Sequence, residues 1–402
     1  MSTRISTAGM HAAALAALLD AQSNLARTQL QIARGTRLTS PADDPVAATR
    51  VQSLTRQIEA ASQYARNSDA ASNRLMAEEQ ALADLGSALD RVRELVLQAN
   101  NATIDDDSRA MIRTEVAGRV QEMLDIANRR DAQGEYLFAG LATATRPFER
   151  SAAGVTYRGD QGQRQQAVSA TQRVADGDSG YAVFQQAPGG NGTFVTRPDA
   201  GNAGTGVIGA GSVVDPTAWT GGSYTIRFVA VDAWEVVDDT AAVPTVVAAG
   251  AYASGNAISF AGISIEVSGA PAAGDSFTLA AAAPVEMFTA LDDLVEALGI
   301  STGTPAGRAQ LNSRLGGSLA QVDQLLGHLQ QLRAGVGVRL ATVDGAVASQ
   351  EAATLELESL RSSLRDLDYA EAISRLNQQY VTLQAAQQSL ARVGQLSLFD
   401  YL

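Results

Sequence analysis

The sequence predicts a mainly α-helical protein with a β-rich insertion: an elongated helical rod built from both chain ends, which carries an outer β domain. Three observations predict this class. Residues 1–133 contain almost no glycine or proline outside the stretch Gly35–Pro45. Residues 305–394 are again typical of helices, whereas the residues between these arms mix glycine and proline with short runs of Val, Ile, Thr and Tyr. The arms therefore follow a helical pattern and the middle follows a strand pattern.

The first arm predicts three helices. Its first helix ends near Gly35, and Pro41 and Pro45 bracket the turn that follows. Asp44 is placed to cap a second helix with Pro45 at its first position, where the missing N–H is not needed. That helix extends to about Ala99, and the run Asp105–Asp107 opens a third. In the first helix, one seam of three- and four-residue steps contains Leu15, Leu18, Gln22, Leu25, Gln29 and Ile32.

The second arm repeats this pattern. One long seam extends from Leu315 to Leu364. Each helix of either arm has a single apolar stripe, so we expect the two chain ends to pack together and the middle to project from them. Gln22, Gln29 and Gln387, at core-like positions, are expected to fix the register between neighbouring helices. The last predicted helix has the seam Ile373, Leu376, Tyr380, Leu383, Gln387 and Leu390.

These patterns predict three domains. Residues 1–44 with 366–402 form a terminal coiled-coil assembly domain. Residues 45–149 with 286–365 form a helical rod domain, and residues 150–285 form a β-rich outer domain whose connections leave near Gly140 and return near Pro284. Aromatic residues are only 5% of the chain, which predicts thin seams between helices rather than thick aromatic cores.

The charge and residue composition exclude several classes of protein. The net charge is −13 and all 30 basic residues are Arg, without a basic stripe, so nucleic acid is not an expected partner. The absence of cysteine excludes disulfides, thiolate metal sites and thiol nucleophiles. The uncharged stretch 240–265 is broken by proline and glycine, so no membrane-spanning helix is predicted.

No residue pattern predicts a catalytic, cofactor or metal site. Gly204–Gly209 matches a dinucleotide-binding glycine pattern, but no helix can follow it. Asp105–Asp107 lacks the alternating spacing of a calcium loop and fits helix capping. His11 and His328 have no second ligand nearby in the sequence, which argues against zinc or a catalytic triad. Arg4 before the apolar run Ala12–Leu19 faintly resembles a signal peptide, but the helical pattern continues in phase beyond it, so no cleaved signal is expected.

Four separated segments resemble the flagellin family. The first is the turn between the first two helices, with Gly35, Arg37, Asp43, Asp44 and Pro45. Three others resemble the hook-associated junction members of that family rather than its filament subunits, whose turn and tail differ from those found here. They are Tyr136–Gly140 with Thr145–Phe148 after it, Tyr157–Arg164, and Leu396–Leu402.

The resemblance implies a secreted structural subunit of the bacterial flagellum that joins the hook, through hook-associated protein 1, to the flagellin filament. It implies polymerisation of the chain with itself into a ring, export by the flagellar type III apparatus, and a dedicated export chaperone. No cofactor and no enzyme activity are expected. The residues predicted to form the assembly interface are Leu15, Leu18, Leu25, Ile32, Ile373, Leu376, Tyr380, Leu383, Leu390, Leu396, Leu398 and Phe399.

Two alternatives remain open from the sequence. One is a filament flagellin. The other is a secreted enzyme on a flagellar export arm, which would need a catalytic constellation within residues 150–285; that stretch contains no His or Cys.

Overall fold

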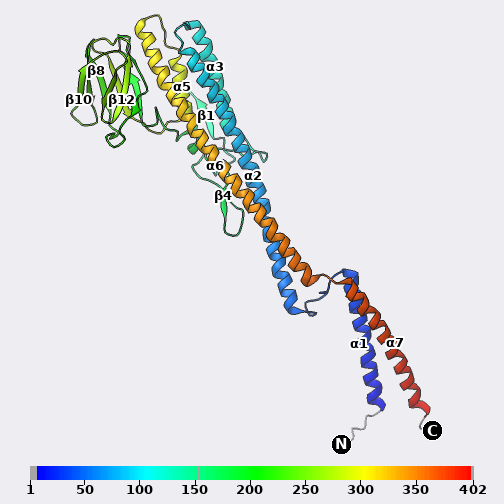
Figure 1. Ribbon diagram of the computed structural model, residues 1–402. Helices are drawn as coiled ribbons and strands as arrows, with labels where there is room; N and C mark the ends of the chain where they lie inside the picture. Colours follow the sequence, from blue (N-terminus) through cyan, green and yellow to red (C-terminus); the bar gives the residue numbers. More distant parts are fainter. Residues whose placement is uncertain (1–6, 153, 400–402) are drawn as a thin grey trace. The chain divides into compact units, whose positions relative to one another are not determined.

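The computed structural model describes residues 7–152 and 154–399, which divide into two compact units. The first unit combines Met1–Arg66 with Ala346–Leu402, and the second is Asn67–Gly345. Terminal helices flank a β-rich middle, which confirms the predicted fold class (Figure 1). The observed division has two parts, so the three-part domain scheme remains a prediction.

The long helices begin and end where the sequence predicts. Helix α1 ends one residue before Gly35, and α2 begins at Pro45. The carboxylate of Asp105 caps α3 by accepting a hydrogen bond from the Ser108 backbone N–H at 2.7 Å. A short helix, α5, precedes α6 and was not predicted separately. The helix bounds are α1 Thr7–Arg34, α2 Pro45–Ala99, α3 Asp106–Ala127, α4 Gly180–Phe184, α5 Met287–Ala297, α6 Pro305–Arg365 and α7 Tyr369–Phe399.

The second unit has a helical core built from the predicted apolar stripes. The stripes of α2, α3 and α6 are buried, and α5 adds a strongly amphipathic face that contacts α3. Each buried Leu or Val of this kind stabilises the fold by roughly 1.5–3 kcal/mol. The most deeply buried members are Leu75, Leu82, Leu85, Leu89, Val92, Val116, Val120, Leu291, Leu294, Leu315, Val322, Leu325 and Leu329.

Aromatic residues form two dense clusters, so the prediction of thin seams without aromatic cores is wrong. Although the chain has few Phe residues, most are completely buried. In the first cluster, the rings of Phe148 and Phe184 lie 4.8 Å apart, and Phe288 of α5 stacks on Phe184 at 5.5 Å. The composition gives the number of aromatic side chains, but it does not say whether they are dispersed through the fold or clustered in one core.

Two of the segments that resemble the hook-associated members, Tyr136–Gly140 with Thr145–Phe148 and Tyr157–Arg164, lie at this first cluster. The Tyr157 hydroxyl donates to the carbonyl oxygens of Phe138 (3.1 Å) and Asp160 (2.7 Å). Gly140 has a φ of +71°, and a side chain there would collide with Asp160. The two segments are therefore parts of one packing arrangement. The strands here are the hairpins β1 Phe148–Ser151 with β2 Gly154–Tyr157, and β3 Gln165–Ala167 with β4 Arg173–Ala175.

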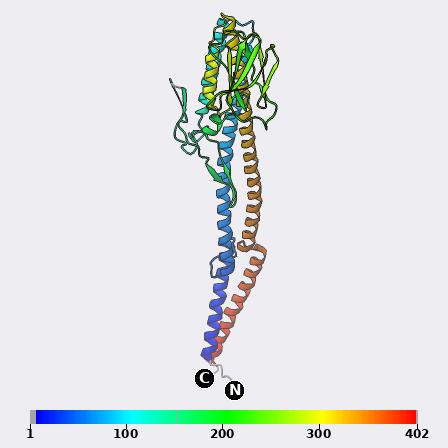
Figure 2. The same ribbon diagram turned by 90° about the vertical axis from the view of Figure 1, so that its left-hand side faces the viewer.

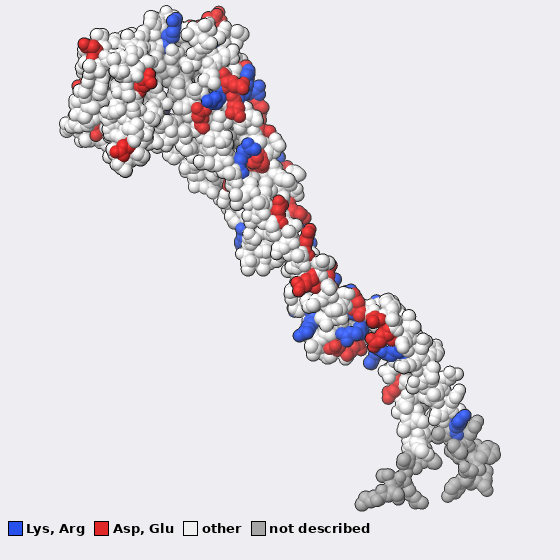
Figure 3. Space-filling view, viewed as in Figure 1, with Lys and Arg blue, Asp and Glu red and all other residues white. Residues whose placement is uncertain are grey.

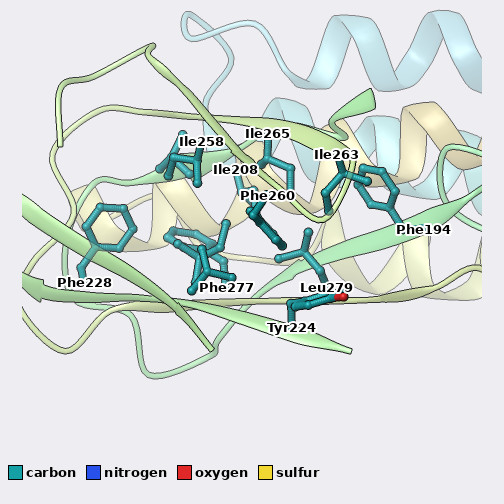
Figure 4. Close-up of a cluster of buried hydrophobic side chains, with 13 residues drawn as sticks. Phe194, Ile208, Tyr224, Phe228, Ile258, Phe260, Ile263, Ile265, Phe277 and Leu279 are labelled. Carbon is teal, nitrogen blue, oxygen red and sulfur yellow. The ribbon is translucent and has the colours of Figure 1, made fainter. Parts of the chain in front are cut away.

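The second aromatic cluster lies in a β-sandwich. One antiparallel sheet has the order β10-β9-β8-β13-β5, and the other has the order β11-β12-β6 with β7 also paired to β12. Side chains from both sheets meet in the core drawn in Figure 4, including Phe194, Phe228 and Phe277. The residues of β8 alternate between the core and the surface, because Tyr224, Ile226 and Phe228 are buried and the residues between them are not. The bounds are β5 Phe194–Pro198, β6 Val207–Ile208, β7 Ser212–Val213, β8 Tyr224–Ala230, β9 Ala233–Asp238, β10 Thr245–Ala251, β11 Ala257–Phe260, β12 Ile263–Ser268 and β13 Ser276–Ala281.

The chain enters and leaves the sandwich at one place, where Val285 pairs with Ala187 and its N–H donates to the Ala187 carbonyl at 2.8 Å. The exit is therefore later than the predicted one near Gly140, because residues 148–187 pack against helices instead. Side chains of α6 anchor the sandwich. Gln321 bonds to the backbone of Gly190 and Pro188 at 2.7 and 2.9 Å, and the buried Ser313 hydroxyl accepts from Ile208 N–H at 3.2 Å.

Replacing residues 190–283 with a short Gly/Ser linker should leave the helical part of the second unit folded, because the two ends of the excision are adjacent. Circular dichroism should retain the helical signal and cooperative melting. A matched variant that replaces residues 150–283 should lose cooperative melting, because it also removes Tyr157 and Phe184 from the aromatic cluster. Equal behaviour of the two variants would show that residues 150–187 are not part of the helical core.

Candidate assembly interface

Helices α1 and α7 lie side by side within the first unit (Figures 1 and 2). On each helix an inner line of side chains, with seven-residue spacing, is buried or half-buried. Small residues recur along these lines, at Ala14 and Ala21 on α1 and at Ala372 and Ala386 on α7, which lets the two backbones approach closely. The inner lines contain Ala14, Leu18, Ala21, Leu25, Thr28 and Ile32 on α1, and Ala372, Leu376, Gln379, Leu383, Ala386 and Leu390 on α7.

A second line on each helix lies one position further along the sequence, about 100° around the helix axis. Its side chains are exposed in this chain, and half of them are large apolar or aromatic groups. Leu15 is 46% exposed, Ile373 49% and Tyr380 56%. We call this the outer line, which consists of Leu15, Gln22 and Gln29 on α1 and Ile373, Tyr380 and Gln387 on α7.

The predicted interface residues therefore separate into two groups. Leu18, Leu25 and Ile32 lie on the inner line of α1, and Leu376, Leu383 and Leu390 lie on that of α7. Leu15, Ile373 and Tyr380 lie on the outer line instead. Gln22, Gln29 and Gln387 are also exposed, so they do not fix the register between α1 and α7, and their role in the register with helices of another chain stays a prediction. The contact between α1 and α7 uses only one line of side chains on each helix, so the outer line is left exposed.

Several contact residues were missed by the sequence analysis. Ala372 is completely buried, and Thr28 and Gln31 are nearly so. The signal that could have found them is the seven-residue spacing of small residues at Ala14, Ala21 and Thr28, one position before the predicted seam.

The apolar tail begins at Leu396, just after Gly394. Helix α7 passes through Gly394 and ends at Phe399. The side chains of Leu396, Leu398 and Phe399 lie outside the described part of the chain, so their predicted role in assembly stays a prediction.

The predicted family turn joins the two chain ends by backbone hydrogen bonds. Arg37 N–H donates to the Arg365 carbonyl at 2.7 Å, and Leu367 N–H donates to the Gly35 carbonyl at 3.1 Å. Gly35 has a φ of +67°, and a Cβ there would lie 2.9 Å from the Tyr369 hydroxyl. The Arg37 guanidinium also donates to the Leu364 carbonyl at 2.9 Å. Gly35 and Arg37 therefore hold the turn after α1 against the turn before α7.

The two aspartates of the turn have separate roles. The Asp43 carboxylate accepts hydrogen bonds from the Thr39 hydroxyl (2.7 Å), the Thr39 N–H (3.0 Å) and the Ser40 N–H (2.9 Å). These bonds, that of the Thr39 hydroxyl above all, lower the pKa of Asp43. The Asp44 carboxylate caps α2 by accepting from Ala47 N–H at 2.9 Å, and Pro45 occupies the first helical position as predicted.

The charged residues of the first unit gather near this turn. The face drawn in Figure 3 shows blue and red side chains around the turn and few along α1 and α7. Between Thr7 and Arg34 the only charged residues are Asp20, Arg27 and Arg34. The paired helices therefore present a largely uncharged surface that includes the outer line, and such patches mark interaction sites. None of the described helices is long and apolar enough to cross a membrane.

A chain whose two ends form one helical unit, with an uncharged and partly apolar outer surface, has the architecture of a subunit that polymerises through its termini. Family models agree. Residues 5–143 match the bacterial flagellin N-terminal helical region, and residues 319–402 match the flagellin C-terminal helical region. Residues 198–281 match the D2-like domain of flagellar hook-associated protein 1, and they lie in the β-sandwich.

Solved structures resemble the chain over nearly their whole length. Xanthomonas campestris FlgL is 35% identical with a TM-score of 0.72, and the match covers 77% of this chain and 99% of that one. The Legionella pneumophila flagellar hook-associated protein 3 is 29% identical with a TM-score of 0.75, over 78% and 98% of the two chains. Hook-associated protein 3 of Salmonella typhimurium is 30% identical over 181 residues, which is 45% of this chain and 56% of that relative. The chain belongs to the flagellin family, in its hook-associated protein 3 (FlgL) branch.

Proposed function

We propose that this protein is a structural subunit of the hook–filament junction of the bacterial flagellum, joining the hook, through hook-associated protein 1, to the flagellin filament. It polymerises with itself into a ring through the terminal helices, and it catalyses no reaction. It reaches the junction by type III export, with the help of an export chaperone.

The exposed outer line of α1 and α7 is the observation that carries this proposal. Leu15, Ile373 and Tyr380 remain about half exposed after α1 and α7 have paired. Burying side chains of this kind contributes roughly 1.5–3 kcal/mol each, so a second chain that covers them gains a substantial contact. The glutamines on the same line could set the register between subunits.

The likeness to FlgL structures supports a junction subunit over the alternative of a filament flagellin, because it covers 77% of the chain, whereas the flagellin family models match only residues 5–143 and 319–402. The enzyme alternative has little support from the geometry. The described part of residues 150–285 forms a β-sandwich with an aromatic core and contributes strands to two hairpins.

Deleting the gene in its host should abolish swimming while flagellin is still produced and released into the medium as unattached subunits. The reason is that a filament without a junction cannot stay on the hook. Immunoblotting of the medium and electron microscopy of the cells measure this result, and a plasmid copy should restore attached filaments. Loss of flagellin protein from both cells and medium would contradict a junction role, as would normal filaments on the deletion strain.

A further inference from the structure

A buried carboxyl group on α2 takes no part in the assembly surfaces described above. Glu78 is 1% exposed. Its Oε1 atom accepts a hydrogen bond from the Asp178 backbone N–H at 2.9 Å, whereas Oε2 has no hydrogen-bond partner among the described residues. Burying a carboxylate that has one oxygen without a hydrogen bond destabilises the folded state strongly, whereas burying the neutral acid destabilises it much less.

The charged groups around Glu78 come from three parts of the second unit. On the loop after β4, the Asp178 carboxylate accepts from Gln163 Nε2 at 2.6 Å and pairs with Arg339 of α6. Arg74, one helical turn before Glu78 on α2, is bonded to Asp131 at 2.5 Å and to the carbonyls of Tyr136 and Leu137. Arg339 is thus the cation that faces Glu78 and Asp178 together. The remaining charges of the network, Glu135 and Asp176, pair with Arg164 at 3.0 and 2.7 Å.

The single guanidinium of Arg339 balances the charge of one buried carboxylate but not of two. With Glu78 neutral, the Asp178–Arg339 pair is balanced. With Glu78 ionised, two buried carboxylates share one guanidinium. Burial raises the pKa of Glu78 to about 8, and the charge of Asp178 acts in the same direction while Arg339 opposes it.

Asp178 lies just after β4, at the base of the β3–β4 hairpin. Residues 159–179 contain the β3–β4 hairpin, and its contacts with α2 include a hydrogen bond from Asn67 Nδ2 to the Ala167 carbonyl at 2.9 Å. At the same end of the hairpin, Arg164 lies opposite Asp176, and its guanidinium is bonded to Asp176 and to Glu135. The backbone bond between Asp178 and Glu78 and the ion pair with Arg339 are what connect the base of the segment to α2 and α6.

We propose that Glu78 and Asp178 form a proton-operated latch, which fastens residues 159–179 to α2 and α6 while Glu78 is protonated and loosens them when its proton passes to solvent. The direction follows from linkage. A carboxyl group whose pKa is higher in the folded state stabilises that state fully below its unfolded pKa of about 4.5, and this stabilisation is lost as the pH rises towards 8. The latch is therefore closed in mildly acidic solution and open in alkaline solution.

Hydrogen exchange of the full chain at about pH 6.5 and about pH 9, corrected for the pH dependence of intrinsic amide exchange, tests the latch. Protection of peptides from residues 163–179 should fall by about tenfold or more in the wild-type protein as the pH rises. Glu78→Gln should keep its protection at both pH values, because the amide does not ionise. Glu79→Gln is the matched control, since Glu79 is its neighbour in sequence but pairs with Arg333 at 2.7 Å on a more exposed part of α2, and it should behave like the wild type.

Peptides from residues 82–96, in the helical core, provide the internal reference. Constant protection of residues 163–179 in the wild-type protein would overturn the proposal, and so would an equal loss in Glu78→Gln. If Glu78→Gln fails to fold, Asp178→Asn supplies the second test. In that variant Arg339 can pair with the ionised Glu78, so residues 163–179 should no longer lose protection as the pH rises. A loss of protection that persisted in Asp178→Asn would also overturn the proposal.

Discussion

Replacing Arg74 with methionine should lower the free energy of unfolding by about 3–5 kcal/mol, the largest single-residue loss that we expect in this protein. The Arg74 and Asp131 side chains are 6% and 5% exposed, and they are joined at 2.5 Å. Methionine fills much of the same volume but leaves the Asp131 carboxylate buried without its cation. It also removes the donor to the carbonyls of Tyr136 and Leu137.

Urea denaturation of the full chain, followed by circular dichroism, measures this loss. The matched control is Arg93→Met, because Arg93 pairs with Asp323 at 2.6 Å but both side chains are more than two-fifths exposed. An exposed pair of this kind should contribute little to stability. Adding Asp131→Asn to Arg74→Met should recover part of the stability, since the unpaired charge is then gone. Losses of similar size in Arg74→Met and Arg93→Met would show that the buried ion pair has no special role.

Replacing Ile373 and Tyr380 together with aspartate should abolish function while leaving the isolated chain as stable as the wild type. Both side chains are already about half exposed, so their replacement removes little packing within the chain. If a neighbouring subunit covers them, the loss is roughly 3–6 kcal/mol for the pair, which weakens each contact by about a hundredfold or more. In the proposed ring this contact recurs at every subunit, so the loss of affinity recurs at each of them.

Swimming assays, and immunoblots of released flagellin, measure the effect in a deletion strain that carries the variant. The control is Val229→Asp with Val231→Asp, because these side chains are 57% and 66% exposed on the β-sandwich and receive the same added charge. The control should support normal swimming. Full swimming of cells with Ile373→Asp and Tyr380→Asp would rule out the outer line as an assembly surface, provided that thermal melting shows both variants to be folded.

The sequence by itself determined the helices of both arms. Pro45 and Asp44 set the beginning of α2, Asp105 set that of α3, and the glycine at position 35 set the end of α1, because caps, prolines and positive φ angles act within a few residues. The fold class and the family resemblance followed from the same local signals. These effects act between residues that are close in the sequence, so they can be recognised from one sequence without a structure.

Only the tertiary structure decided which apolar line of each terminal helix faces inward. The sequence placed Leu15 and Leu18 on one seam, whereas the structure buries the line of Leu18 with Ala14 and leaves Leu15 outside. Two adjacent lines have the same period, so periodicity cannot choose between them. The choice depends on the shape of the partner helix, where Ala372 and Ala386 allow close approach.

The same reason explains the buried charges and the aromatic clusters. Arg74 meets Asp131, and Glu78 meets Asp178, across separations of 57 and 100 residues in the sequence. No periodicity or composition connects such positions, since the chain between them can take many paths. Whether a carboxyl group keeps its charge depends on the groups that folding places around it, and that environment exists only when α2, α6 and the loop before α4 have come together.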